Sequence, residues 1–159
     1  LIRKEGEPLK PWVPVFALTG AIALVTGLMM TFTWPLPGSY NIAFGELSVF
    51  FGGLMLAASW HLMKEWDLKP LSLYGLFAGL AAGVIGVQFF RLGLSKAPVL
   101  AGTGFLLAGL AGIGAYSAVK FKSRTLRVSG AVVLMASGLI WAYLGYSAFW
   151  SHMAGFMNR

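Results

Sequence analysis

The chain has 159 residues, of which 58% are apolar and 11% charged, and its mean hydropathy is +0.77. About a quarter of the residues in a soluble domain are charged, so this composition excludes an ordinary soluble domain and indicates a membrane protein. The formal net charge is +7, but the basic residues stand between apolar runs, which is typical of membrane topology signals and not of a nucleic-acid-binding surface. The chain has no cysteine, which excludes disulfides and thiolate metal sites.

Five apolar runs are long enough to cross a bilayer, which takes about 20 mostly apolar residues. They cover approximately residues 13–33, 40–62, 71–91, 97–119 and 127–150. None alternates apolar and polar residues as the strands of a membrane barrel do. The first run is not followed by a small-residue cleavage motif, so we expect a span and not a secretory signal, and whether residues precede Leu1 stays open. We predict an all-α fold, with residues 1–159 forming a single transmembrane domain of five bundled helices.

Lysine and arginine predict the orientation of the chain, because they gather on the cytoplasmic side of membrane proteins. The N-terminal tail and the second and fourth loops hold most of them: Arg3, Lys4, Lys10, Lys64, Lys69, Lys120, Lys122, Arg124 and Arg127. The opposite side holds Arg91, Lys96 and Arg159. We therefore expect the N-terminus inside and the C-terminus outside, with the inner basic loops in contact with anionic lipid.

Small residues predict which helix faces pack together, because apolar area does not drive helices together in lipid. The third run has such a face at Gly75, Gly79 and Gly83, and the fourth run has one at Gly104, Ala108 and Gly112. We expect a neighbouring helix on each of these faces. The same role is expected in the first and fifth runs of Gly20, Gly27, Gly138, Ala142 and Gly145.

The main candidate for function is Glu46, the only acid within an apolar run. An ionised carboxylate in the bilayer is costly unless it is paired, protonated or hydrated. Its expected partner is Arg91, or failing that Gln88 or Asn41, in an outer polar layer to which His152 also belongs. Three interpretations stay open: a structural tie between the second and third helices, a site for a proton, ion or ligand, and a contact with a partner subunit.

The sequence offers few ligands for a metal or a haem. His61 and His152 are predicted on opposite sides of a hydrocarbon core of about 30 Å, so they cannot ligate one haem within this chain. His152, Met153 and Met157 form a loose set of candidate ligands for Cu(I). No nucleotide-binding glycine motif is present. We expect no cofactor of the chain's own, with haem or copper shared with a partner subunit as an open alternative.

The run Trp-Pro-Leu-Pro-Gly-Ser-Tyr-Asn-Ile-Ala-Phe-Gly-Glu, from Trp34 to Glu46, is the most distinctive stretch of the chain. In a small five-span protein it resembles a family of uncharacterised prokaryotic membrane proteins that is known as a domain of unknown function. This resemblance implies a location in a bacterial or archaeal membrane. It brings no catalytic residues to transfer to this chain.

We expect a non-catalytic integral-membrane subunit of a larger membrane complex in the prokaryotic cytoplasmic membrane, energy-transducing or redox in kind. The grounds are the small mass outside the membrane, the missing ligand set and several glycine faces. Its expected partners are other membrane-protein subunits and lipid, and not nucleic acid. The alternative is a small oligomeric transporter or channel with an outward-facing polar site at Glu46 and Arg91.

Overall fold

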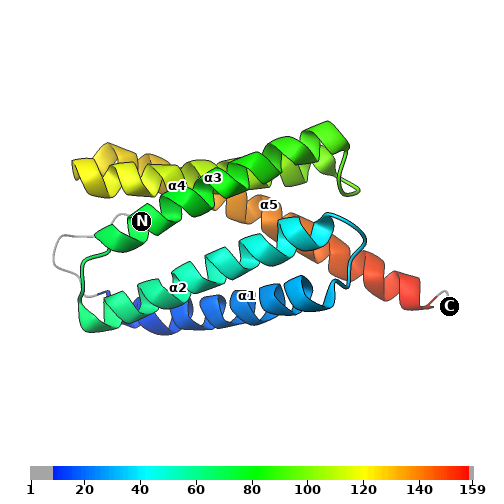
Figure 1. Ribbon diagram of the computed structural model, residues 1–159, viewed down its shortest axis with the longest axis horizontal. Coiled ribbons are helices and arrows are strands. Elements are labelled where there is room, and N and C mark those ends of the chain that lie inside the picture. Colours follow the sequence, from blue (N-terminus) through cyan, green and yellow to red (C-terminus); the bar gives the residue numbers. More distant parts are fainter. Residues whose placement is uncertain (1–8, 158–159) are drawn as a thin grey trace.

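The structure is a computed structural model that describes residues 9–157, and within this range it contains five long helices and no strand (Figure 1). The helices are α1 (Val13–Thr33), α2 (Leu47–Lys64), α3 (Lys69–Leu92), α4 (Pro98–Phe121) and α5 (Arg124–Met157). A 3₁₀ turn, η1 (Lys10–Trp12), leads into α1, and a π-helical turn, η2 (Asn41–Glu46), leads into α2. All five helices are long and apolar enough to cross a membrane, which confirms the predicted all-α, multi-pass fold.

The helix bounds follow local sequence signals. Pro14, Pro70 and Pro98 each lie in the first turn of a helix, where the missing N–H has no helical partner to lose. If η2 is counted with α2, the helices lie within three residues of the predicted spans, except that α5 continues seven residues past the predicted end at Trp150. The extension contains no proline that would end the helix. With it, α5 has 34 residues and a length of about 51 Å.

Four helices end at a residue in the left-handed conformation. These residues are Trp34, Glu65, Gly93 and Lys122, with φ of 50°, 57°, 60° and 50° respectively. The conformation lets the N–H of the end residue turn back to the helix, as in the 3.2 Å bond from Trp34 to the carbonyl of Met30. Only Gly93 adopts it without a steric cost.

The helices form two antiparallel pairs and one oblique helix (Figure 1). Helix α1 packs along α2, and α3 packs along α4. Helix α5 packs on α4 and crosses the other helices at an angle, with its C-terminal part extending past them. Contacts between α2 and α3 are sparser, so the two pairs are less closely joined than the helices within each pair.

Glycine seams allow the close approach within each pair. A Cβ atom added to Gly27 would lie 2.8 Å from the carbonyl oxygen of Gly45, and one added to Gly79 would lie 2.7 Å from that of Gly109. Among the glycines expected to pack, Gly20, Gly75 and Gly112 also meet the neighbouring helix of their pair. At Gly20, Gly27, Gly79 and Gly112 an added Cβ would lie within 3.0 Å of the neighbouring backbone, so a larger residue has no room there, whereas at Gly75 it would make an ordinary contact at 3.9 Å.

Three glycines differ from their expected roles. A Cβ at Gly83 would have open space around it, although Gly79 one turn away is closely packed. Gly138 and Gly145 of α5 also face open space, so none of the helices within residues 9–157 covers them. Gly104 does pack, but its neighbour is α5, where Trp141 would lie 3.1 Å from an added Cβ. A regular four-residue spacing therefore does not place every glycine against the same neighbour.

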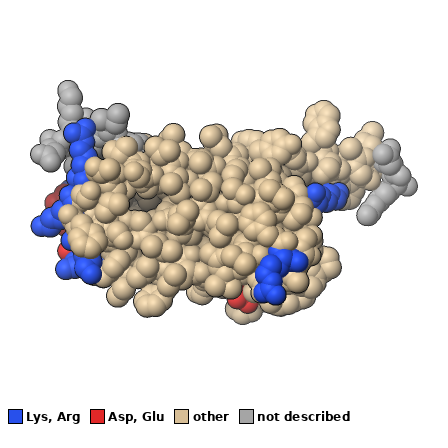
Figure 2. All heavy atoms as spheres, turned by 90° about the horizontal axis from the view of Figure 1, so that it is seen from above, with Lys and Arg blue, Asp and Glu red and all other residues tan. Residues whose placement is uncertain are grey.

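The charged side chains lie at two ends of the molecule. Figure 2 shows Lys and Arg gathered at both ends of one face, with a wide band of other residues between them. We call one end the Lys10 end; it includes η1 and the loops at 65–68 and 122–123. The other is the Trp34 end; it includes the loops at 34–40 and 93–97 and the end of α5. Arg3, Lys4 and Arg159, which were used to predict the orientation, lie outside the described residues.

Candidate functional site

Aromatic side chains join the helices at the Trp34 end. Phe89 and Phe105 are buried, and the ring of Phe44 lies 5.7 Å from each of them and 6.0 Å from Trp141. Phe44 belongs to η2, whereas the other three belong to α3, α4 and α5. Through Phe44, the π-helical turn adds to the direct contacts of α2 with α3 that join the α1/α2 pair to the rest of the bundle.

Asn41, predicted as a member of a polar site, holds the first loop together. Its side chain is fully buried, and its Oδ1 accepts a 2.9 Å hydrogen bond from the N–H of Leu36. Its Nδ2 donates to the carbonyl oxygens of Leu36 and Gly38. These bonds satisfy backbone groups that the prolines of the loop leave without helical partners. The role of Asn41 in the structure is thus to close the loop.

Tyr40 connects this loop to the next loop at the same end. Its hydroxyl accepts a 2.7 Å hydrogen bond from the N–H of Ser95, which lies in the loop between α3 and α4. Its ring stacks on Phe44 with a centroid distance of 6.3 Å. Together Tyr40, Asn41 and Phe44 fix the distinctive Trp34–Glu46 run against both helix pairs.

The predicted pair of Glu46 and Arg91 is not formed. Both residues are exposed, and the ion pair found within residues 9–157 joins Lys10 to Glu65 at 2.8 Å. The physical reason is the direction of the helix faces. Glu46 and Arg91 follow Phe44 and Phe89 by two residues, which is close to half a turn both in the π-helical turn and in α3. With the aromatics inside, both charges point out of the bundle and not toward each other.

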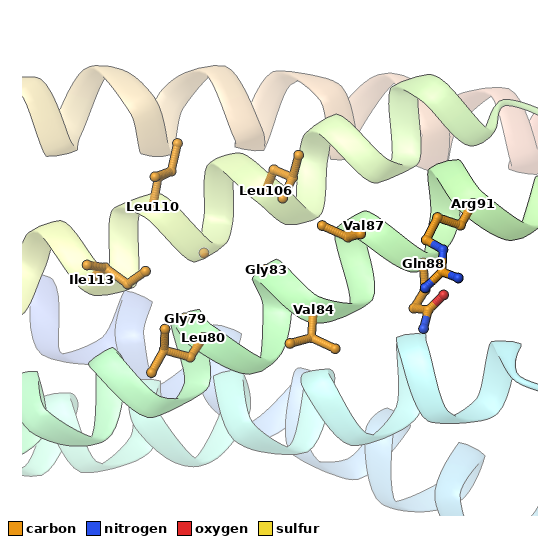
Figure 3. A pocket seen from close by; sticks show the side chains of 11 residues that line it. Gly79, Leu80, Gly83, Val84, Val87, Gln88, Arg91, Leu106, Leu110 and Ile113 are labelled. Atoms are coloured by element: carbon orange, nitrogen blue, oxygen red, sulfur yellow. The ribbon is translucent and has the colours of Figure 1, made fainter.

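Arg91 and Gln88 instead share an open groove between α3 and α4 (Figure 3). The groove has a volume of about 540 Å³. Its lining residues are Gly79, Leu80, Gly83, Val84, Val87, Gln88, Arg91, Leu106, Gly109, Leu110 and Ile113. Neither Glu46 nor Asn41 nor His152 lines it. The expected polar layer is therefore divided: an amide and a guanidinium lie on one groove, and the carboxylate lies elsewhere.

The candidate metal ligands do not converge within the described residues. His152, Met153 and Met157 lie on the exposed last turns of α5, where the two methionines are four residues apart on a continuous helix. His61 lies at the Lys10 end, where its Nδ1 is 2.8 Å from the carbonyl oxygen of Asp67 and its ring meets Trp66 edge to face. No group of three His, Asp or Glu side chains suited to a metal ion occurs between residues 9 and 157.

The Lys10 end carries basic side chains and one ion pair. A hydrogen bond from Lys10, together with its positive charge, lowers the pKa of the Glu65 carboxyl below its ordinary value. Lys120 lies over the rings of Tyr116 and Phe121, at 5.7 and 5.6 Å from their centroids. This arrangement of cations among aromatic rings is typical of helix ends at a membrane–water interface.

Sequence reasoning missed two features of the Trp34 end and one feature of the α1/α2 seam. The π-helical turn has no distinct sequence pattern, since it differs from an α-helix by one residue per turn in its hydrogen bonds. The aromatic cluster joins four segments that are far apart in the chain. The partners of Gly20 and Gly27 were detectable, because Gly45 and Gly52 repeat the same seven-residue spacing on the next helix.

Comparison with known proteins gives one match. No curated protein and no solved structure matches the chain significantly. A family model described as "Protein of unknown function (DUF981)" matches residues 2–155, which is nearly the whole chain and includes the Trp34–Glu46 run. This multi-pass membrane protein therefore belongs to the DUF981 family.

Proposed function

We propose that the chain is a non-catalytic subunit of a larger membrane complex in the cytoplasmic membrane of a prokaryote. The observation that carries the proposal is the position of Glu46. It follows Tyr40 by six residues, it points out of the bundle, and its carboxylate has no ion pair within residues 9–157. Carboxylates at membrane depth rarely face lipid, and a basic or hydrogen-bond-donating group of another subunit would satisfy this one.

Helix α5 gives independent support. It has 34 residues, and among them only Ser137 is buried by the rest of the chain. Gly138 and Gly145 face open space on this helix. Small residues in membrane helices are enriched where another backbone comes close, and a partner helix would occupy this position. An energy-transducing or redox complex is the class we favour, with any haem or copper held mainly by the partner subunits.

The alternative function, an oligomeric transporter or channel, has less support. It requires Glu46 and Arg91 to face a common cavity, whereas the groove that Arg91 lines does not include Glu46. The experiment described next therefore also distinguishes a transporter from a subunit of a complex.

The test is purification from the native membrane in a mild detergent, followed by mass spectrometry of the co-purifying chains and a visible absorption spectrum. The subunit role predicts stable co-migration with other polypeptides. Glu46→Gln should weaken this association at least about tenfold, because the truncation of one partner of a desolvated charge pair costs about 2–5 kcal/mol. Glu65→Gln is the matched control, since it removes an exposed carboxylate whose partner, Lys10, lies in the same chain.

Two results would reject the subunit role. One is a homogeneous homo-oligomer that is stabilised by a solute and transports it when reconstituted alone. The other is co-migration that Glu46→Gln and Glu65→Gln leave equally unchanged, because Glu46 would then have no partner in the complex.

A further inference from the structure

We propose that the groove between α3 and α4 binds one hydrocarbon chain of an anionic membrane lipid, with the lipid phosphate at Arg91 and Gln88. This site uses neither Glu46 nor α5, so it stands independently of the subunit role. Its evidence is the shape of the groove, its length and the position of its polar groups.

The shape of the groove results from glycine. Gly79 and Gly109 bring the backbones of α3 and α4 into contact and so form its floor. Gly83 leaves the space above this floor empty, because an added Cβ would meet nothing within 4 Å. Branched aliphatic side chains form the two walls: Leu80, Val84 and Val87 from α3, and Leu106, Leu110 and Ile113 from α4 (Figure 3). The result is a narrow apolar channel that is open along one side.

The length of the groove fits one leaflet of a bilayer. Along α3 the groove extends from Gly79 to Arg91, twelve residues or about 18 Å. Half of a hydrocarbon core of about 30 Å is about 15 Å. A lipid chain that starts at the Trp34 end therefore has wall contacts over its whole length. The volume of about 540 Å³ is also that of a small-ligand site.

Polarity identifies the headgroup. Gln88 and Arg91 supply the polar side chains of the lining, and in Figure 3 they lie next to each other at one end of the groove. The Arg91 guanidinium is exposed and has no ion pair within residues 9–157. A guanidinium presents paired N–H donors that match phosphate oxygens, and the Gln88 amide adds a further donor. An anionic lipid from the leaflet at the Trp34 end meets both requirements: its hydrocarbon chain fits the apolar channel and its phosphate fits the cationic end.

The experiment measures retained lipid by native mass spectrometry of the purified chain. The chain is equilibrated with equal amounts of palmitoyl-oleoyl phosphatidylglycerol and phosphatidylcholine. Wild type should retain one lipid, with phosphatidylglycerol preferred. Arg91→Gln should lower this preference about fivefold, the factor that corresponds to ~1 kcal/mol per basic residue at an anionic membrane surface. Lys96→Gln is its control, because Lys96 is a cation at the same end that does not line the groove.

A second pair of variants tests the channel. Gly83→Leu should fill it and abolish retention of both lipids, while Gly114→Leu, which also points into open space but outside the groove, should leave retention unchanged. Thermal unfolding of both variants checks that they fold. If Gly83→Leu does not fold, Val84→Trp fills the groove from an exposed wall position.

Three results would overturn the proposal. Retention by the folded Gly83→Leu variant would show that the lipid binds elsewhere. Equal effects of Arg91→Gln and Lys96→Gln would show general surface attraction. Stabilisation by soluble glycerol phosphate as strong as that by the lipid would show that the headgroup alone is recognised and that the groove plays no part.

Discussion

At the scale of single residues, two aromatic side chains determine where two charges lie. Phe44 and Phe89 occupy the core at the Trp34 end, and each turns a charge two residues later toward the outside. The sequence places Glu46 and Arg91 at similar depth, but depth does not specify a helix face. The face is decided by which side chain gains most from burial, and a phenylalanine buries far more apolar area than a carboxylate can.

Asn41 gives a residue-scale prediction about the first loop. Asn41→Ala removes three hydrogen bonds that the buried Asn41 side chain makes to the backbone of Leu36 and Gly38, two residues that are themselves exposed. Each such hydrogen bond contributes about 0.5–1.5 kcal/mol, so we expect the free energy of unfolding to fall by roughly 2 kcal/mol. Unfolding in a titration with a denaturing detergent measures this loss. Ser39→Ala, at an exposed position of the same loop, should have little effect, and an equal loss in both variants would contradict the role of Asn41.

Glu65 gives a prediction about pH. Its pKa is lowered in the folded chain by the hydrogen bond and charge of Lys10. The pair therefore stabilises the fold at pH values above the ordinary pKa of a glutamate. This contribution is lost as the pH falls through the lowered value, and it is small because both side chains are largely exposed. Lys10→Gln should raise the pKa of Glu65 in a carbon-13 NMR titration. An unchanged pKa would show that the pair does not persist in solution.

At the scale of the helices, glycine spacing predicts contact faces only in part. The seven-residue repeats Gly20–Gly27 and Gly45–Gly52 meet along one seam, as do Gly79–Gly86 and Gly102–Gly109. Seven residues are close to two full turns, so such glycines stay on one face, whereas a four-residue repeat drifts around the helix. Gly83 shows the drift, since it lies beside the seam and opens the groove.

Gly79→Leu and Gly83→Leu form a matched pair at this scale. A side chain at residue 79 meets the backbone of Gly109, whereas one at residue 83 meets open space. Overpacking costs about 1–3 kcal/mol, so Gly79→Leu should lower the free energy of unfolding by roughly 2 kcal/mol and Gly83→Leu should not. The same detergent titration measures both. Equal stability of the two variants would mean that α3 and α4 are not packed as described.

At the scale of the whole molecule, the sequence predicts the fold well and the candidate site poorly. Hydropathy and length suffice for five spans because lipid requires every backbone group to be bonded within a helix. The rotation of each helix depends on packing between distant segments, such as Phe44 against Trp141, which no local pattern encodes. For this reason the depth of Glu46 and Arg91 could be estimated from the sequence, whereas the pair expected between them is not formed.

The orientation of the molecule in the membrane is a further prediction. From the basic residues of the Lys10 end we predict that this end lies in the cytoplasm, with Ser39 outside and Ser123 inside. The chain has no cysteine, so single cysteines at these two positions report unambiguously. An impermeant thiol reagent applied to intact cells should label residue 39 and leave residue 123 unlabelled until the cells are lysed. Labelling of residue 123 alone would show that the chain has the opposite orientation. Equal labelling of both residues would contradict the presence of three spans between residues 39 and 123.

The left-handed helix ends combine backbone strain with side chains that glycine could not supply. A residue other than glycine in this conformation costs about 1–2 kcal/mol, yet a chain with 21 glycines has Trp34, Glu65 and Lys122 at three of four such ends. Glycine would relax each turn, but it would remove an interfacial ring, the partner of Lys10 and a basic side chain of the Lys10 end. Tryptophan and lysine are among the residues that anchor membrane helices at the boundary between lipid and water. Glycine at Trp34 or Lys122 would therefore ease the turn but would remove an anchor that resists sliding of the helix through the bilayer.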